Sequence, residues 1–155
     1  MNEPEQNRTA QVERKTRETD ISICVTLGSR NVDIATGIGF FDHMLHALGF
    51  HGALGLEVKA AGDLHVDYHH VVEDTGIVLG KALRKAVGPD PSLVRFASAV
   101  VPMDEALAQA AVDVSGRGGA FFDDQVGRGW VRDFSASLCL EFFKAFAREA
   151  GMTVH

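Results

Sequence analysis

The chain has 155 residues, of which 46% are hydrophobic and 23% charged, and its formal net charge is −6. This length allows one domain with a substantial core and is too short for two comfortable ones. The negative net charge disfavours a surface that binds nucleic acids or anionic membranes, because the electric field of such a protein repels phosphate groups. Two isolated cysteines, a polar N-terminus without a secretory signal and the lack of a membrane-length apolar run are typical of a reduced, cytoplasmic protein.

The first forty residues predict a tail and two paired strands. Residues 1–9 are expected to be a flexible tail, and residues 10–155 a single domain. Apolar side chains alternate with polar ones over 16–27, which predicts a half-buried strand with Glu18 on its polar face. After a turn, residues 32–34 are expected to return as the hairpin partner of this strand.

An amphipathic helix is expected next. Phenylalanine, methionine and leucine recur at four-residue intervals from position 40, and Gly49 is expected to end the helix. His43 lies off the apolar stripe, beside Asp42. By itself it is better explained as an exposed helix histidine than as a metal ligand. His51 follows in a turn that can point it toward a pocket.

The central stretch "GDLHVDYHHVVEDTG" carries the strongest chemical pattern. Alternation predicts strands over 54–58 and 64–68, the second leading into a helix that extends to residue 88. His69, His70 and Glu73 then share one helical face at spacings of three and four. Imidazole nitrogens and a carboxylate form a donor set for a transition metal. An isolated HHxxE motif also recurs by chance, so a solvated helix start is the alternative.

The second half predicts a hairpin, a short strand, a helix and a final strand. Two strands joined at "PMDE" have Arg95 and Arg117 near their outer ends. The guanidinium fork suits phosphate, although a surface role explains either arginine alone better. "AFFDDQVGRGW" is expected to form a short strand and loop, residues 133–151 a helix, and "MTVH" the start of a strand.

An internal repeat links the two halves. "FFDHMLHALGFHGALGLEV" and "FFKAFAREAGMTVH" share a double phenylalanine, a helix, a glycine and a strand, which predicts two copies of one unit over about 10–90 and 91–155. His69 lies 28 positions after Phe41, and the same interval after Phe143 ends at position 171. The second copy is therefore expected to lack its last helix. Such a gap leaves apolar sheet surface uncovered.

Five segments together resemble one known family, imidazoleglycerol-phosphate dehydratase of histidine biosynthesis. They are "RKTRETDI", "GIGFFDHMLHALGFHG", "GDLHVDYHHVVEDTGI", "VPMDEALAQAAVDVSGR" and "VRDF" with the helix to "GMTVH", and they cover nearly the whole chain in order. The resemblance implies an α+β fold of the ribosomal-protein-S5-domain-2-like type, with two pseudo-repeats and helices on one face of each sheet. It also implies a homo-oligomeric shell of 24 subunits with metal sites between subunits, and a chain that stops before the second HHxxE motif of the family.

The resemblance further implies a hydro-lyase that converts imidazole glycerol phosphate, a small phosphate substrate, to imidazole acetol phosphate. Each site is expected to bind two Mn(II) ions, which would stabilise an anionic imidazole ring. The residue roles implied in this way are metal ligation by His43, His69, His70 and Glu73, acid/base catalysis by Glu18, substrate contact by Asp42 and His51, and phosphate binding by Arg95 and Arg117.

Two positions depart from the family pattern. Glu141 stands where the second repeat of the family has a histidine, which alters the donor set, although glutamate is a good ligand for manganese. Tyr68 stands where the family often has aspartate. A relative that keeps the fold and part of the metal site without turnover is therefore the alternative to an active enzyme. A nucleic-acid binder is disfavoured by the acidic balance.

Overall fold

The computed structural model, which describes residues 8–123 and 128–155, contains two four-stranded sheets with the same strand order. The first has the order β1-β2-β4-β3 and the second β5-β6-β10-β7; in each, the last two strands are parallel and the other neighbours antiparallel. This shared order confirms the predicted pair of repeats. The strands are β1 (Thr9–Lys15), β2 (Thr19–Leu27), β3 (Val32–Ala35), β4 (Leu54–Gly62), β5 (Phe96–Met103), β6 (Ala106–Asp113), β7 (Gly119–Ala120) and β10 (Thr153–Val154).

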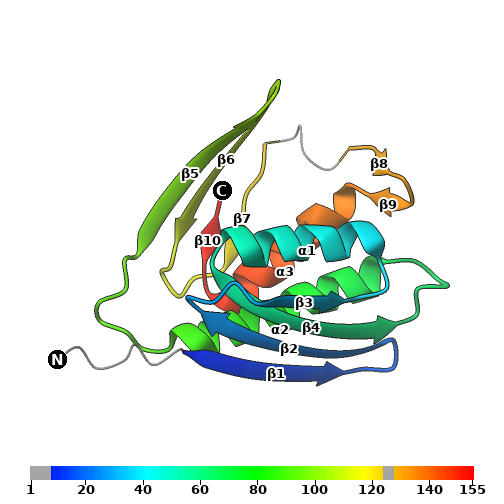
Figure 1. Cartoon of the computed structure of the whole chain (residues 1–155), viewed down its shortest axis with the longest axis horizontal. Coiled ribbons are helices and arrows are strands. Elements are labelled where there is room, and N and C mark those ends of the chain that lie inside the picture. Colours follow the sequence, from blue (N-terminus) through cyan, green and yellow to red (C-terminus); the bar gives the residue numbers. More distant parts are fainter. Residues whose placement is uncertain (1–7, 124–127) are drawn as a thin grey trace.

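Three helices pack between and beside these sheets (Figure 1). They are α1 (Gly39–His51), α2 (His69–Val87) and α3 (Ser137–Ala150), and a small hairpin of β8 (Trp130–Val131) and β9 (Phe134–Ser135) precedes α3. Helix α2 packs on β1 and β2, α1 packs on β3 and β4, and α3 packs against α2. The α+β class with helices on one face of a sheet is thus confirmed.

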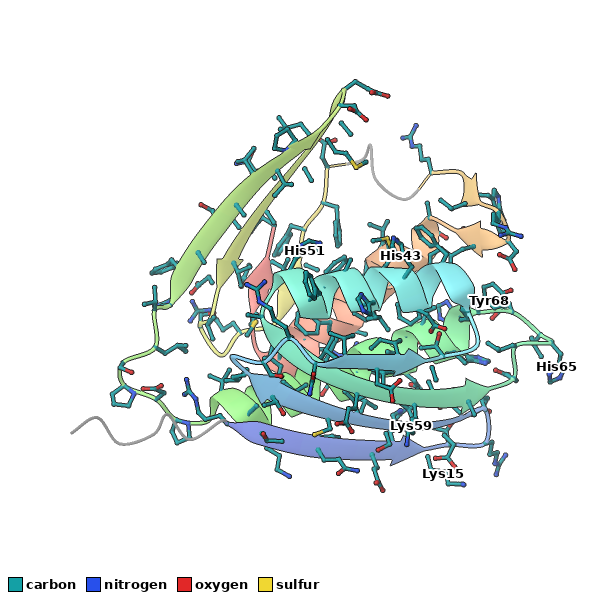
Figure 2. The ribbon with its side chains drawn as sticks, viewed as in Figure 1. Lys15, His43, His51, Lys59, His65 and Tyr68 are labelled. Atoms are coloured by element: carbon teal, nitrogen blue, oxygen red, sulfur yellow. The ribbon has the colours of Figure 1, made fainter. Side chains whose placement is uncertain are left out.

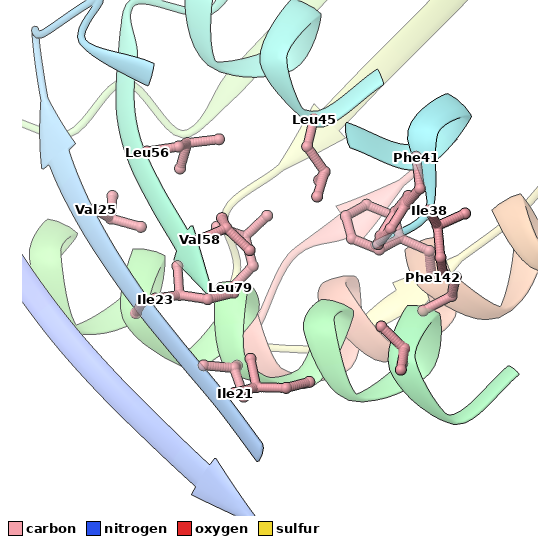
Figure 3. Packing of buried hydrophobic residues seen from close by; sticks show 14 of the residues in the cluster. Ile21, Ile23, Val25, Ile38, Phe41, Leu45, Leu56, Val58, Leu79 and Phe142 are labelled. Carbon is pink, nitrogen blue, oxygen red and sulfur yellow. The ribbon is translucent and has the colours of Figure 1, made fainter. Parts of the chain in front are cut away.

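The core lies between the first sheet and the helices (Figure 3). Alternate residues of β2 and β4 point inward and are almost fully buried, as the period of two requires. Aromatic side chains from α1, β9 and α3 close the other side, with the Phe41 and Phe142 rings 5.5 Å apart edge to face. The buried side chains shown include Ile21, Ile23, Val25, Leu56, Val58, Leu79, Leu45, Phe41 and Phe142.

Two glycines allow α2 and α3 to pack closely. A Cβ on Gly76 would lie 2.6 Å from the carbonyl oxygen of Phe142, and one on Gly80 would lie 2.5 Å from that of Phe146. Both distances are shorter than van der Waals contact, so only glycine fits at these positions. This contact fixes the position of the second repeat against α2.

The hairpin of β5 and β6 is exposed along most of its length. Val101 is 60% exposed, Met103 72% and Leu107 69%. The equivalent strands β1 and β2 are covered by α2, and Figure 1 shows β5 and β6 reaching away from the helices. The expected uncovered apolar surface is therefore present.

Three predictions about strands were wrong. Strand β3 is not the hairpin partner of β2, because β4 lies between β2 and β3 in the sheet. Strand β3 instead pairs in parallel with β4, and α1 provides the crossover connection that a parallel pair needs. The segment 16–27 is not one strand, since a turn at 16–18 separates β1 from β2. Residues 64–68 form turns instead of a strand: the Val66 N–H donates to the Asp63 carbonyl (2.8 Å), so the alternation there has no neighbouring strand to pair with.

The helix boundaries also differ. Helix α1 continues past Gly49 and ends at His51. Gly49 is buried, and a Cβ there would lie 2.9 Å from the Leu54 carbonyl oxygen. The glycine therefore allows close packing and does not end the helix. Helix α3 begins at Ser137 and not at 133, since Phe134 belongs to β9 and is buried. Strand β1 begins at Thr9, inside the predicted tail, while residues 1–7 of that tail lie outside the described residues. None of the described helices is long and apolar enough to cross a membrane.

Gly80→Ala should lower the free energy of unfolding by about 1–3 kcal/mol, because the added methyl group overpacks the contact between α2 and α3. Urea denaturation measures the change. Gly39→Ala is the matched control: a Cβ there meets no atom within 4 Å, so its stability should stay within about 1 kcal/mol of the parent chain. Equal stability of the two variants would contradict the close helix packing.

Candidate functional site

Three segments distant in the sequence meet at one end of the molecule. They are the turn between β1 and β2, the loop 63–68 with the first turn of α2 that follows it, and the hairpin of β8 and β9 (Figure 1). This end carries His69, His70, Glu73 and Glu18. The structure therefore brings the central histidine motif and the predicted acid/base carboxylate into one region.

His69 and Glu73 form a pair of donor atoms on the first turn of α2. The His69 Nε2 and Glu73 Oε2 atoms are 3.3 Å apart, as their spacing of four on a helix allows. Both side chains are partly exposed, at 42% and 37%. The Asp67 carboxylate accepts a hydrogen bond from the His69 N–H (2.8 Å) and so fixes the start of the helix. This arrangement presents one imidazole nitrogen and one carboxylate oxygen to the same point.

His70 points to a different side and pairs with Asp63. Its Nδ1 is 2.9 Å from the Asp63 Oδ2, and the His69 and His70 rings are 6.0 Å apart at 78°. The hydrogen bond to Asp63 raises the pKa of His70, and the same bond lowers the pKa of Asp63. The two adjacent histidines therefore do not converge on a single point.

Glu18 lies in the turn between β1 and β2 and not on the face of a strand. The Thr16 hydroxyl accepts hydrogen bonds from the N–H groups of Glu18 and Thr19 (3.1 and 2.9 Å). The Asp63 N–H donates to the Glu18 carbonyl oxygen (3.1 Å). The exposed Glu18 side chain is thus carried by a turn whose backbone is tied to the loop before α2.

Asp74, which the sequence did not single out, anchors this end of the molecule. It is 8% exposed and accepts hydrogen bonds from Arg14 Nε (2.9 Å) and from the Thr19 hydroxyl (2.5 Å). A buried carboxylate needs such partners. These contacts join β1, β2 and α2 one turn away from the histidine motif, so Asp74 fixes the position of Glu18 relative to α2.

A cavity of ≈ 410 Å³ lies beside His69. The Tyr68 hydroxyl donates to the Asp133 Oδ2 (2.6 Å) across its wall, which connects α2 to the hairpin of β8 and β9. This bond raises the pKa of Tyr68 and lowers that of Asp133. The unusual tyrosine before the histidine pair was the only sequence signal for this contact. The cavity is lined by Leu64, Asp67, Tyr68, His69, Trp130, Asp133, Ser135 and Leu138.

The predicted residues on α1 are divided between its two ends. His43 is exposed in the N-terminal half of the helix, and His51 occupies its last turn instead of a following loop (Figure 2). The Asp42 Oδ1 atom accepts hydrogen bonds from the Thr36 N–H and hydroxyl (2.9 and 2.5 Å). Asp42 therefore holds the connection into α1 in this chain.

The predicted phosphate-binding residues Arg95 and Arg117 flank the hairpin of β5 and β6, where β5 begins and β6 ends at the opposite end of the molecule from the first turn of α2 (Figure 1). Arg95 forms a two-point ion pair with Asp113, at 2.6 and 3.0 Å, while Arg117 is exposed after β6. Glu141 on α3 forms an ion pair with Lys144 (3.0 Å). None of these three residues lines the cavity beside His69.

Within residues 8–123 and 128–155, no three histidine, cysteine, aspartate or glutamate side chains converge to hold a metal ion. The first turn of α2 provides two converging donors, and His70 provides a third that points elsewhere. These donor types suit manganese, but one chain does not complete a coordination sphere.

Comparison with known proteins gives a consistent result. A family model described as "Imidazoleglycerol-phosphate dehydratase" matches residues 36–155. The chain is 52% identical to the protein of that name from Acidiphilium cryptum (strain JF-5), covering 96% of this chain and 76% of the relative, and 49% identical to that from Clostridium acetobutylicum, covering 97% and 77%.

Solved structures agree with these matches. The imidazoleglycerol-phosphate dehydratase of Staphylococcus aureus subsp. aureus N315 is similar, with a TM-score of 0.84 and 35% identity over 95% of this chain and 81% of that one. The enzyme from Pyrococcus furiosus, solved in complex with (S)-C348, has a TM-score of 0.79 and 36% identity over 93% and 77%.

Asp133→Asn should move the phenol titration of Tyr68 to lower pH, toward the ordinary value of about 10, because the carboxylate that disfavours the tyrosinate is removed. Tyr68 is the only tyrosine, so absorbance at the tyrosinate band reports it alone. Asp20→Asn, at an exposed carboxylate beside Lys15, is the control and should leave the midpoint unchanged. An unchanged midpoint in Asp133→Asn would contradict the observed contact.

Proposed function

The chain belongs to the imidazoleglycerol-phosphate dehydratase family, and from this premise we propose that it dehydrates imidazole glycerol phosphate to imidazole acetol phosphate at a two-manganese site completed between subunits. Its family membership and its class, a hydro-lyase of histidine biosynthesis, agree with the prediction from the sequence. The manganese ions, the residue roles, the homo-oligomer and the cytoplasmic location are proposals.

One observation carries the proposal. His69 Nε2 and Glu73 Oε2 converge to 3.3 Å beside a cavity, at the end of the molecule where the turn bearing Glu18 is tied to the loop before α2. A metal-binding pair with a carboxylic acid at the same end of the molecule is a recurrent arrangement for removing and delivering protons.

The ligand roles follow from the directions of the side chains. His69 and Glu73 would hold one ion, and His70, whose ring is turned 78° from that of His69, would hold a second. Bound Mn(II) supplies Lewis-acid stabilisation of negative charge on the substrate imidazole. His43 and Glu141 would complete the donor sets, and since neither joins the His69 pair within one chain, they would do so from neighbouring subunits.

Glu18 would move the protons of the dehydration. The reaction removes a carbon-bound proton and a hydroxide from neighbouring carbons, so a group must take the proton and one must protonate the departing oxygen. Glu18 is exposed, and its backbone is held by Thr16 and Asp63. This leaves the carboxylate free to swing between the two positions.

Substrate phosphate would bind to arginines of another subunit. Arg95 and Arg117 flank the hairpin of β5 and β6, which begins at the other end of the molecule from the first turn of α2, so a substrate bound at His69 would meet such arginines only if a neighbouring subunit presents its own. Arg95 would exchange its ion pair with Asp113 for a phosphate contact, since its guanidinium accommodates either oxyanion. His51 and Asp42 would line the substrate region in the same way. The exposed apolar hairpin of β5 and β6 supports a homo-oligomer.

A non-catalytic relative that keeps part of the metal site is the second candidate. The observation that favours it is the lack of three converging donors in the part of the chain that the structure describes. The two candidates differ in turnover, which a dehydratase assay measures directly.

With Mn(II) and imidazole glycerol phosphate, the oligomeric chain should release imidazole acetol phosphate, and Glu18→Gln should lower kcat by about 10²–10⁴-fold, the usual contribution of acid/base catalysis. Glu18→Gln keeps the shape of the side chain, so metal content should be unchanged. Full activity in Glu18→Gln would remove its catalytic role. A lack of turnover in the parent chain would favour the non-catalytic candidate.

His69→Ala should lower the manganese content per chain, because it removes one of two converging donors. Elemental analysis after dialysis against Mn(II) measures the content. His65→Ala is the control: His65 is an exposed histidine of the same loop region, pointing outward at its tip (Figure 2), and should leave the content unchanged. Equal manganese in both variants would contradict the ligand assignment.

A further inference from the structure

Asp63 lies in the central histidine stretch, but none of the roles assigned above belongs to it. It directly follows β4, and its carboxylate crosses the loop to the ring of His70, with Oδ2 2.9 Å from Nδ1. The Asp63 side chain is 19% exposed, while His70 is 44% exposed. The Asp63 carboxylate thus contacts the Nδ1 edge of the His70 ring from the less exposed side, and the opposite edge of the ring faces solvent.

We propose that Asp63 is a positioning residue that holds the His70 imidazole as the Nδ1–H tautomer, so that the Nε2 lone pair points outward to bind a divalent cation. This rests on the proposed ligand role of His70. An ionised carboxylate only accepts hydrogen bonds, so the proton between the two groups must lie on Nδ1. A neutral imidazole with its proton on Nδ1 has its free lone pair on Nε2.

The backbone of Asp63 performs a second positioning function. Its N–H donates to the Glu18 carbonyl oxygen (3.1 Å), so one residue contacts both the turn of Glu18 and the ring of His70. The preceding Gly62 permits this approach: a Cβ there would lie 3.0 Å from the same Glu18 carbonyl and 2.5 Å from a methyl group of Val71. Glu18 and His70 are therefore set relative to each other through Asp63.

The remaining oxygen of Asp63 argues against a purely structural role. Oδ1 is buried, and no described residue donates a hydrogen bond to it. Carboxylates that serve only stability have their buried oxygens paired, as Asp74 does with Arg14 and Thr19. Asp63 instead directs one oxygen to one imidazole nitrogen. Carboxylates in this position raise the affinity of a histidine ligand for its metal.

The test compares Asp63→Ala, Asp63→Asn and His70→Ala with the parent chain, and Asp20→Asn is the control at an exposed carboxylate. Ring ¹⁵N shifts of labelled histidine in the metal-free chain, above the pH at which His70 is protonated, report the tautomer. Titration with Mn(II), followed by electron paramagnetic resonance, reports affinity. Circular dichroism checks that each variant is folded.

The parent chain and Asp20→Asn should have the Nδ1–H tautomer at His70. Asp63→Ala should lose it and bind Mn(II) about 10–100-fold more weakly. Asp63→Asn, whose amide oxygen can still accept from Nδ1, should keep the tautomer and recover part of the affinity. Retention of the Nδ1–H tautomer in Asp63→Ala would overturn the proposal. The proposal would also be overturned if Asp63→Ala loses the tautomer but binds Mn(II) as tightly as the parent chain, while His70→Ala binds Mn(II) more weakly.

Failure of the proposed function gives a different result. If His70→Ala binds Mn(II) as tightly as the parent chain, His70 is not a ligand, and the ligand set of the proposed function is wrong. The tautomer measurement would then still decide whether Asp63 controls the ring, because it is made without metal.

Discussion

The buried carboxylate of Asp74 holds β1, β2 and α2 in one fixed arrangement. Its two oxygens are paired with Arg14 and Thr19, and loss of either partner would leave a buried acceptor unpaired at a cost of about 1–3 kcal/mol. Thr19 begins β2 directly after Glu18, and Asp74 directly follows Glu73. Glu18, which would move protons, and Glu73, which would hold metal, are therefore each adjacent in sequence to one partner of this buried interaction. The fold thus sets the distance between them.

The two repeats share a strand order but differ in their environment. The first sheet is covered by α1 and α2 and forms most of the core, whereas β5 and β6 are exposed. The candidate site residues follow the same division. His69, His70 and Glu73 belong to the first repeat. Arg95 and Glu141 belong to the second, where Arg95 pairs with Asp113 and Glu141 with Lys144. A site that needs both sets is one that neighbouring subunits would complete.

Sequence periodicity was sufficient for the helices, the hairpin of β5 and β6 and the repeat, because burial on one face leaves a period of 3.6 or 2. It failed where tertiary contacts decide. Gly49 resembles a helix end but serves close packing, and the alternation at 64–68 has no partner strand. At the site, the HHxxE spacing predicted the His69–Glu73 pair. The roles of Asp63, Asp74 and Asp133 depend on partners 7 to 65 positions away and left no local pattern.

The central claim is that the first turn of α2 binds manganese through different sides of adjacent histidines. Anomalous diffraction at the manganese edge, from crystals grown with Mn(II), locates the ions directly. We expect one anomalous peak between His69 Nε2 and Glu73 Oε2 and a second at His70 Nε2, on the side of the ring away from Asp63. Manganese peaks elsewhere, with none at these atoms, would contradict it.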